Sequence, residues 1–274
     1  AKGMAPTRDD VDKDVGRTFQ EHRFFQDEGG RRALRRVLLA YAMHNPRVSY
    51  CQSMNVLAGM MLLLMEEEDA FWLLAALVED LLPGYYCQDL SGAQVDQLVL
   101  ERLVQRRLPS LHARLERCSL PLQLAAVRWF MAVYVMTLPP GAALRVWDAF
   151  LLEGSSVLFA VALHLLQGAE ERVGEDWDDT AVFDVLKGLG GDVVDADAVM
   201  EGARVHAQGL AVEVRALQEE CRPLVAARLE HMRRAKEERR KAVAAAAAGA
   251  AAAESVPEAP AAAPTVPAAP AATC

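Results

Sequence analysis

The stretch GGRRALRRVLLAYAMHNPRVSYCQSMNVLAGMMLLLM, residues 29–65, contains the signals that decide the fold. In its first half, apolar side chains recur at spacings of three, four and seven residues, at Leu34, Val37, Leu38 and Tyr41. Residues at these spacings share one side of a helix. The pattern therefore predicts an amphipathic helix whose apolar face is buried.

The second half of this stretch predicts a central helix. Asn45-Pro46 ends the first helix, because the residue before a proline disfavours helical backbone. We expect the next helix to begin at Ser49 or Tyr50 and to lie in the middle of the core, since it is apolar nearly all round.

The longest apolar run, 56–65, has ten residues, whereas about 20 are needed to span a bilayer. No transmembrane segment is predicted.

The rest of the body continues the helical pattern without a fixed repeat. Isoleucine is absent, while Leu, Ala, Arg and Glu, which favour helices, are plentiful. Short breakers such as Pro83-Gly84 and Pro109 separate the apolar segments, and one helix is expected over 122–138. The sequence therefore predicts an all-α fold, a single irregular multi-helix domain over residues 8–221.

The composition excludes several classes of protein. The net charge of −9 argues against nucleic acid as a partner. The five cysteines are odd in number and widely spaced, and they contain no Cys-x-x-Cys pair, which argues against a disulfide framework and a zinc site. We expect a cytoplasmic protein, because a reducing compartment suits unpaired cysteines.

Both ends of the chain differ from the body. Residues 222–241 carry eight basic and three acidic side chains and predict a basic helix. This segment is either a solvated helix end or a contact for a partner or a membrane. Residues 242–274 contain 18 alanines and five prolines and predict a disordered low-complexity tail. Disorder is also expected for the short segment 1–7.

No self-contained active site is visible in the sequence. It contains no phosphate-binding G-x-x-x-x-G-K loop, no H-E-x-x-H, no G-x-S-x-G and no cluster of histidine with cysteine or carboxylates, so neither a metal nor a cofactor site is predicted. The glycine-rich segment 187–192 is followed by acidic residues that would repel a phosphate. A loop before a helix capped by Asp195 or Asp197 accounts for it better.

Three short motifs occur in order along this helical body. They are VDKDVGRTF at 11–19, VSYCQSMN at 48–55 and LRVWD at 144–148. Together they resemble the TBC domain, the catalytic module of GTPase-activating proteins for Rab GTPases. The first is similar to the family's I-x-x-D-x-x-R motif, with valine for isoleucine, and the second to its Y-x-Q motif. The resemblance covers residues 8–215.

This resemblance implies that Arg17 and Gln52 are a catalytic pair, inserted in trans beside the nucleotide of a GTP-loaded Rab-type GTPase. It also implies that Asp14 holds the arginine or its loop, that Tyr50 braces the glutamine and touches the GTPase, and that Asn55 fixes the start of the core helix. The partner would carry magnesium and GTP, so no cofactor of the chain's own is expected. Such a protein would regulate vesicle trafficking, and its partner would bring it to the periphery of endomembranes.

Four further residues in the family pattern are expected to be structural. They are Trp129, Arg145, Trp147 and Asp148. We expect Trp147 to be an aromatic residue of the core, and Asp148 to make a polar contact at a helix end.

Simpler interpretations of the two catalytic motifs remain open at this point. Asp14 and Arg17 have the i,i+3 spacing of an ordinary helix salt bridge, and Ser49 with Gln52 fits a capping box at a helix start. The family usually has glycine after the glutamine, whereas this chain has Ser53. If the backbone there is left-handed, serine costs about 1 kcal/mol, and if glycine serves to let the GTPase backbone approach closely, serine blocks that contact.

A second departure concerns the start of the chain. Only ten residues precede Val11, so the N-terminal helices of the family, with their Arg-Gly and Trp signature, are expected to be absent. Together with Ser53, this leaves an alternative function. The chain could be a helical adaptor that binds a small GTPase or another partner with weak activation or none.

Overall fold

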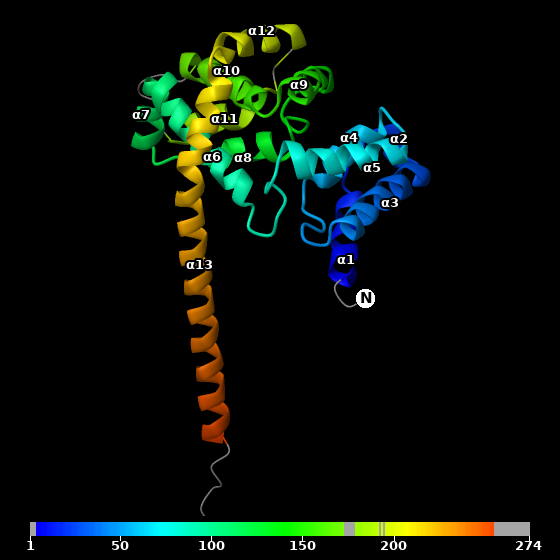
Figure 1. Ribbon diagram of the computed structural model, residues 1–274, viewed down its shortest axis with the longest axis vertical. Helices are drawn as coiled ribbons and strands as arrows, with labels where there is room; N and C mark the ends of the chain where they lie inside the picture. Colours follow the sequence, from blue (N-terminus) through cyan, green and yellow to red (C-terminus); the bar gives the residue numbers. More distant parts are fainter. Residues whose placement is uncertain (1–3, 173–178, 192, 194, 255–274) are drawn as a thin grey trace, which may run out of the picture. The chain divides into compact units, whose positions relative to one another are not determined.

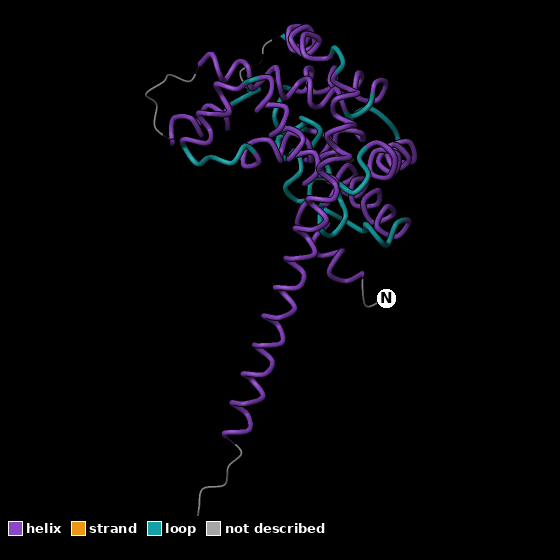
Figure 2. Tube along the Cα trace, turned by 60° about the vertical axis from the view of Figure 1, so that its left-hand side comes forward, coloured by secondary structure: helices purple, strands orange, loops and turns teal. Residues whose placement is uncertain are grey.

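The computed structural model describes residues 4–172, 179–191, 193 and 195–254. Figure 2 shows that these residues form helices and connecting loops, with no strand among them. The prediction of an all-α fold is therefore confirmed. The chain divides into two compact units, 1–229 and 230–274, and each is described by itself.

The first group of helices in the first unit is built around one amphipathic helix. The group consists of α1 (Met4–Val15), α2 (Arg23–Gln26), α3 (Glu28–His44), α4 (Met54–Leu62), α5 (Glu67–Ala76) and the π-helix η1 (Leu77–Leu81). Helix α3 contacts α1, α2, α4 and α5, and Figure 1 shows these elements in blue to cyan. Its predicted apolar face is buried, including Leu34, Leu38 and Tyr41.

A second group of helices surrounds α10. Its members are α6 (Ser91–Arg107), α7 (Pro109–Arg117), α8 (Gln123–Met131), α9 (Pro140–Glu153), α10 (Ser156–Arg172), α11 (Asp179–Gly188) and α12 (Ala196–Ala207). Helix α10 contacts each of the others in this group. Asp195 caps α12 by accepting hydrogen bonds from the backbone N–H groups of Asp197 and Ala198, as one of the two predicted caps.

Two helix boundaries differ from the sequence predictions. Helix α4 begins at Met54 rather than at Ser49 or Tyr50, because Ser53 has a left-handed backbone with a φ of 88°. The helix expected over 122–138 ends at Met131. Val133 and Tyr134 after it also have positive φ values, which a continuous right-handed helix cannot include.

The last helix, α13 (Leu210–Glu254), belongs to both units. Its buried residues run as far as Leu229, which lies eight residues beyond the predicted domain end at 221. Residues 242–254 are helical although the sequence predicted disorder, and alanine, the strongest helix former, accounts for this. Residues 4–7 are also helical, while 1–3 and 255–274 lie outside the described residues.

None of the described helices combines the length and the apolar composition that crossing a bilayer requires.

Candidate functional site

The first part of the site is the turn that follows α1. Asp14 lies in the last turn of that helix and is 6% exposed, and Arg17 follows two residues after the helix ends. The Arg17 Nε donates a 2.8 Å hydrogen bond to Asp14 Oδ1, and Nη2 lies 2.6 Å from the same oxygen. Because the Arg17 side chain is still 56% exposed, the pairing orients the guanidinium without burying it.

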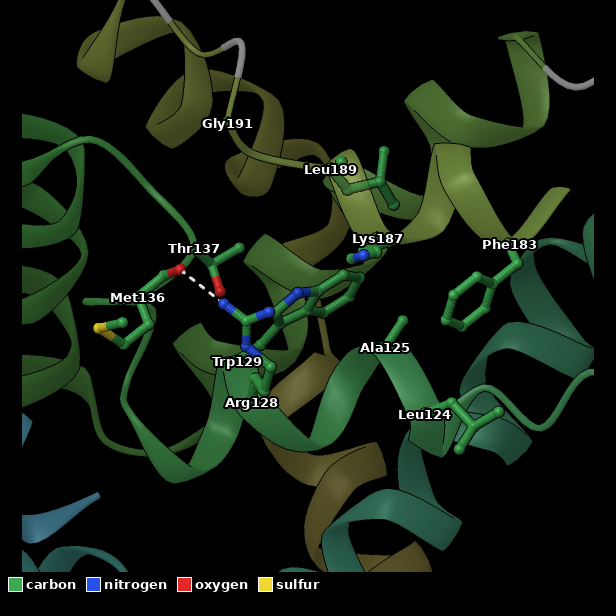
Figure 3. Close-up of a pocket in the computed structure, with 11 residues that line it drawn as sticks. Leu124, Ala125, Arg128, Trp129, Met136, Thr137, Phe183, Lys187, Leu189 and Gly191 are labelled. Atoms are coloured by element: carbon green, nitrogen blue, oxygen red, sulfur yellow. Dashed lines mark hydrogen bonds between the residues drawn. The ribbon is translucent and has the colours of Figure 1, made fainter. Parts of the chain in front are cut away.

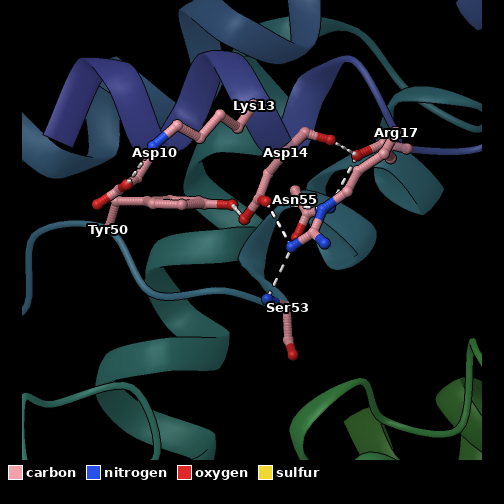
Figure 4. A network of polar contacts seen from close by, with 8 residues as sticks. Asp10, Lys13, Asp14, Arg17, Tyr50, Ser53 and Asn55 are labelled. Carbon is pink, nitrogen blue, oxygen red and sulfur yellow. Dashed lines mark hydrogen bonds and ion pairs between the residues drawn. The ribbon is translucent and has the colours of Figure 1, made fainter.

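Tyr50 holds the other oxygen of the same carboxylate. Its hydroxyl donates a 2.5 Å hydrogen bond to Asp14 Oδ2, so that Asp14 lies between Tyr50 and Arg17 (Figure 4). Burial and this carboxylate raise the pKa of Tyr50 well above its usual value. The phenol therefore stays protonated and acts as a donor. Tyr50 braces the arginine side of the site, whereas the sequence-based expectation was that it braces the glutamine.

Asn55 joins the two loops that carry the predicted catalytic residues. Its Nδ2 donates a 2.7 Å hydrogen bond to Thr18 Oγ1, and the Thr18 hydroxyl donates to the backbone oxygen of Asp14 at 2.6 Å. Its Oδ1 accepts a 3.2 Å hydrogen bond from the backbone N–H of Ser53. Since Asn55 and Thr18 are both buried, one carboxamide fixes the arginine loop and the start of α4 together.

Gly59, one turn further along α4, lets the arginine loop approach closely. A Cβ atom at this position would meet Thr18 Cγ2 and Phe19 Cε2, both at 3.0 Å. Those distances are shorter than ordinary carbon–carbon contacts, so a larger residue would push the loop away from the helix. The sequence pattern gave no sign of this role.

Gln52 is placed by the backbone rather than by side-chain contacts. It is exposed in the turn between Tyr50 and α4, and its side chain makes no hydrogen bond to the residues that the structure describes. The capping-box interpretation is wrong, because the helix begins after Ser53 and Gln52 lies outside it. The left-handed backbone at Ser53 ends the turn and directs the chain into α4.

Arg17 and Gln52 lie on the same concave surface. Both line a hollow of about 350 Å³ together with Asp10, Lys13, Asp14 and Tyr50. Both also line a neighbouring hollow of about 320 Å³, whose other walls include Arg128 from the second helix group. Side chains that are 35 positions apart in the sequence are thus brought together, between the first helix group and the end of α8.

Comparison with known proteins places the chain in a family. The profile of the Rab-GTPase-TBC domain matches residues 2–173, which is more than half of the chain. The chain belongs to the Rab-GTPase-TBC domain family.

Individual relatives agree with this assignment. Human growth hormone-regulated TBC protein 1 is 37% identical over 226 residues, which cover 80% of this chain and 67% of that protein. TBC1 domain family member 2A from Mus musculus is 40% identical over 68% of this chain. The chain spans 16% of a putative GTPase-activating protein from Emericella nidulans and 21% of the mouse protein, so it corresponds to one part of these longer relatives.

Solved structures show the same fold. The Chlamydomonas flagellar RabGAP TBC domain is 33% identical, with a TM-score of 0.65 over 73% of this chain and 67% of that chain. The Ypt/Rab-GAP domain of Gyp1p has a TM-score of 0.64 over 74% of this chain and 73% of its own. Its identity of 19% supports the likeness in fold alone.

One residue of this TBC domain reaches the cavity without having been predicted there. Arg128 on α8 lines the same hollow as Arg17 and Gln52, and its Nη2 donates a 3.2 Å hydrogen bond to the backbone oxygen of Met136 (Figure 3). It also lines an adjacent pocket with Lys187. The sequence contains Arg128 in the run Arg-Trp-Phe, but nothing in the sequence places it beside a residue at position 17.

The two predicted structural tryptophans support the turn that follows α8. Trp129 is buried and stacks on Tyr134 with ring centroids 6.2 Å apart. The indole Nε1 of Trp147 donates a 2.9 Å hydrogen bond to the backbone oxygen of Val133, and Trp147 is buried as expected. Through this turn, the tryptophans help to place Met136 and the cavity wall that it shares with Arg128.

Arg145 and Asp148 of the same family pattern lie on the surface of α9. The Arg145 side chain is 3.1 Å from Asp197 and 3.9 Å from Asp148, and all three side chains are more than half exposed. The expected helix-end contact of Asp148 is wrong, because this residue lies inside α9, which continues to Glu153. Neither residue lines the hollows that contain Arg17 and Gln52.

The described residues contain no group of three or more histidine, cysteine, aspartate or glutamate side chains arranged to hold a metal ion.

Proposed function

We propose that this chain accelerates GTP hydrolysis by a Rab-type small GTPase in its GTP-bound state, and that it does so by inserting Arg17 and Gln52 beside the nucleotide. The observation that carries this proposal is the convergence of the two side chains on one concave surface. The partner would carry Mg²⁺ and GTP, and this chain would complete the catalytic group.

The chemistry of Arg17 suits this role. Negative charge on the γ-phosphate oxygens grows in the transition state, and a permanently charged, planar guanidinium can donate two parallel hydrogen bonds to them. In the structure Asp14 engages Nε and approaches Nη2, which leaves Nη1 available. The guanidinium is therefore oriented before the partner arrives, which lowers the entropic cost of ordering it.

The chemistry of Gln52 complements that of Arg17. A carboxamide can accept a hydrogen bond from the attacking water and donate one to a phosphate oxygen at the same time. It therefore aligns the nucleophile without acting as a base. Because the Gln52 side chain has no hydrogen bond within the described residues, a partner can engage both of its polar atoms.

Arg128 is proposed to contact the GTPase rather than the reacting phosphate. Arg128 is exposed, it lines the hollow that Arg17 and Gln52 also line, and the Met136 carbonyl limits the freedom of its guanidinium. We expect Arg128→Ala to raise the KM for the GTPase about tenfold while changing kcat little, because it removes binding that is equal in the ground and transition states. Arg145→Ala, which removes an exposed arginine outside the cavity, is the matched control. An equal effect of both variants would contradict this assignment.

A non-catalytic adaptor is the second candidate, and Ser53 is the observation that favours it. The serine has a φ of 88°, in the region where an L-residue is strained, at the residue directly after Gln52. If this strain displaces the glutamine in the complex, the chain would bind a GTPase without activating it. The presence of both Arg17 and Gln52 supports the first candidate, since an adaptor requires neither.

The test is single-turnover GTP hydrolysis across a panel of Rab GTPases, with binding measured in parallel. An activator accelerates hydrolysis by at least one GTP-loaded Rab. Binding without acceleration across the panel selects the adaptor instead. If activation is found, the cellular role we propose is control of vesicle trafficking, at membranes that the Rab partner occupies.

A further inference from the structure

The second unit of the chain presents a strongly basic segment. Between Glu230 and Ala244 in α13, every side chain is exposed except that of Glu237, which is partly covered. Met232 is 55% and Val243 is 64% exposed. The side chains of this part of α13 are therefore turned to solvent rather than buried in a core.

The charges on this segment are sorted between two sides of the helix. At 100° per residue, six residues fall within one arc of about 120°. They are Met232, Arg233, Lys236, Arg239, Arg240 and Val243, and we refer to them as the basic face. This face carries four cations and two apolar side chains, and it contains no carboxylate.

All three carboxylates of the segment lie outside this arc, and Glu237 lies nearest to it. Glu230 pairs with Arg234 at 2.9 Å, and Glu237 pairs with Lys241 at 3.8 Å. Glu237 also reaches Arg240, which belongs to the basic face, at 3.1 Å. Glu230 and Glu237 are thus engaged in intrahelical pairs, whereas Lys236 at the centre of the basic face and Arg239 at its edge have no ion pair within the described residues.

We propose that the basic face binds the surface of an anionic lipid bilayer, with this segment of α13 lying in the plane of the interface. Clusters of four or more Lys and Arg on an exposed helix suit phosphatidylserine-rich surfaces, where each cation contributes about fivefold to the partition coefficient. Met232 and Val243 lie on the same face and can enter the headgroup boundary.

The pattern of apolar residues favours a membrane over a protein groove. Helices that bind grooves present large apolar anchors at positions i, i+3 or i+4, and i+7. After Met232 the corresponding positions are Lys236 and Arg239, and the next large apolar residue is Val243. A fluid anionic surface requires only charge and shallow apolar contact, which is what this face offers. The proposal is independent of the catalytic role of the first unit.

Sedimentation of the full chain with lipid vesicles tests the proposal. We expect binding to phosphatidylcholine vesicles in which phosphatidylserine makes up about one third of the lipid, and little binding to phosphatidylcholine alone. Binding should weaken as salt rises, because salt screens exposed charges. Lack of serine-lipid-dependent binding at low salt overturns the proposal. Binding to a DNA duplex without binding to vesicles also overturns it, since the face would then select a different polyanion.

A pair of double variants tests the face itself. Lys236→Gln with Arg239→Gln removes two cations from the basic face and should lower the partition coefficient about 25-fold. Arg234→Gln with Lys241→Gln removes the same charge from the opposite side and should lower it less than about fivefold. Glutamine preserves helix propensity, and circular dichroism checks that both variants stay helical. Equal losses in the two variants would show that net charge, rather than this face, decides binding.

Discussion

The loops that carry Arg17 and Gln52 are fixed in different ways. Side chains hold the arginine loop, where Asp14 accepts from Arg17 and from Tyr50, and Thr18 is tied to α4 through Asn55. The glutamine turn depends on the backbone, with Ser53 in the left-handed region and one hydrogen bond from its N–H to Asn55. The side chain of Arg17 is thus oriented before a partner binds, whereas for Gln52 only the backbone is fixed.

This difference has a physical reason. An exposed guanidinium can adopt many rotamers, and a buried carboxylate partner restricts them at the cost of desolvating that carboxylate. Asp14 also lies in the last turn of α1, at the negative end of the helix dipole, where the positive charge of Arg17 is favourable. A neutral carboxamide gains less from such pairing, so backbone geometry alone directs Gln52.

Arg17→Ala removes the guanidinium that the side chains of the arginine loop orient, and it should have the largest effect. We expect the single-turnover rate to fall by about 10³ to 10⁵, the range for an arginine supplied in trans. The melting temperature should change little, because the Arg17 side chain is exposed. Arg17→Lys should restore only a small part of the rate, since an ammonium cannot donate in the same fork. Full activity of the alanine variant would refute the assignment.

Tyr50→Phe tests how far the orientation of Arg17 depends on Asp14. Removing the hydroxyl leaves Asp14 Oδ2 without its donor, and we expect kcat to fall about tenfold with KM almost unchanged. Tyr41→Phe is the matched control, because its hydroxyl donates to Glu79 at 3.2 Å outside both hollows. If the two variants lose the same activity, Tyr50 acts on stability and not on the arginine.

Ser53→Gly changes only the backbone strain in the glutamine turn, and it should have the smallest effect. Glycine adopts positive φ without strain, so the free energy of unfolding should rise by about 1 kcal/mol, measured by urea denaturation. Ser53→Ala keeps the strain and should give no such gain. If the chain with Ser53 is inactive and Ser53→Gly makes it active, the chain with Ser53 is an adaptor and not an activator.

The sequence predicted the helical class and the amphipathic face of α3, because composition and apolar spacing are local properties. The two catalytic candidates came from the resemblance of its motifs to the TBC family. It could not predict that α4 begins after Ser53, since a left-handed serine breaks the usual preference of its residue type. Arg128 was not found because its proximity to Arg17 depends on how α8 meets the first helix group. The role of Gly59 likewise arises from a tertiary contact with Thr18 and Phe19.

A Rab without its own catalytic glutamine shows most directly whether Gln52 of this chain positions the attacking water. Single-turnover hydrolysis is measured with a Rab whose own water-positioning glutamine is replaced by leucine. If Gln52 acts in trans, the intact chain still accelerates this Rab variant, and Gln52→Ala lowers that acceleration by about 10² to 10³. Acceleration of the unmodified Rab but not of the leucine variant, with Gln52→Ala fully active, would contradict the account.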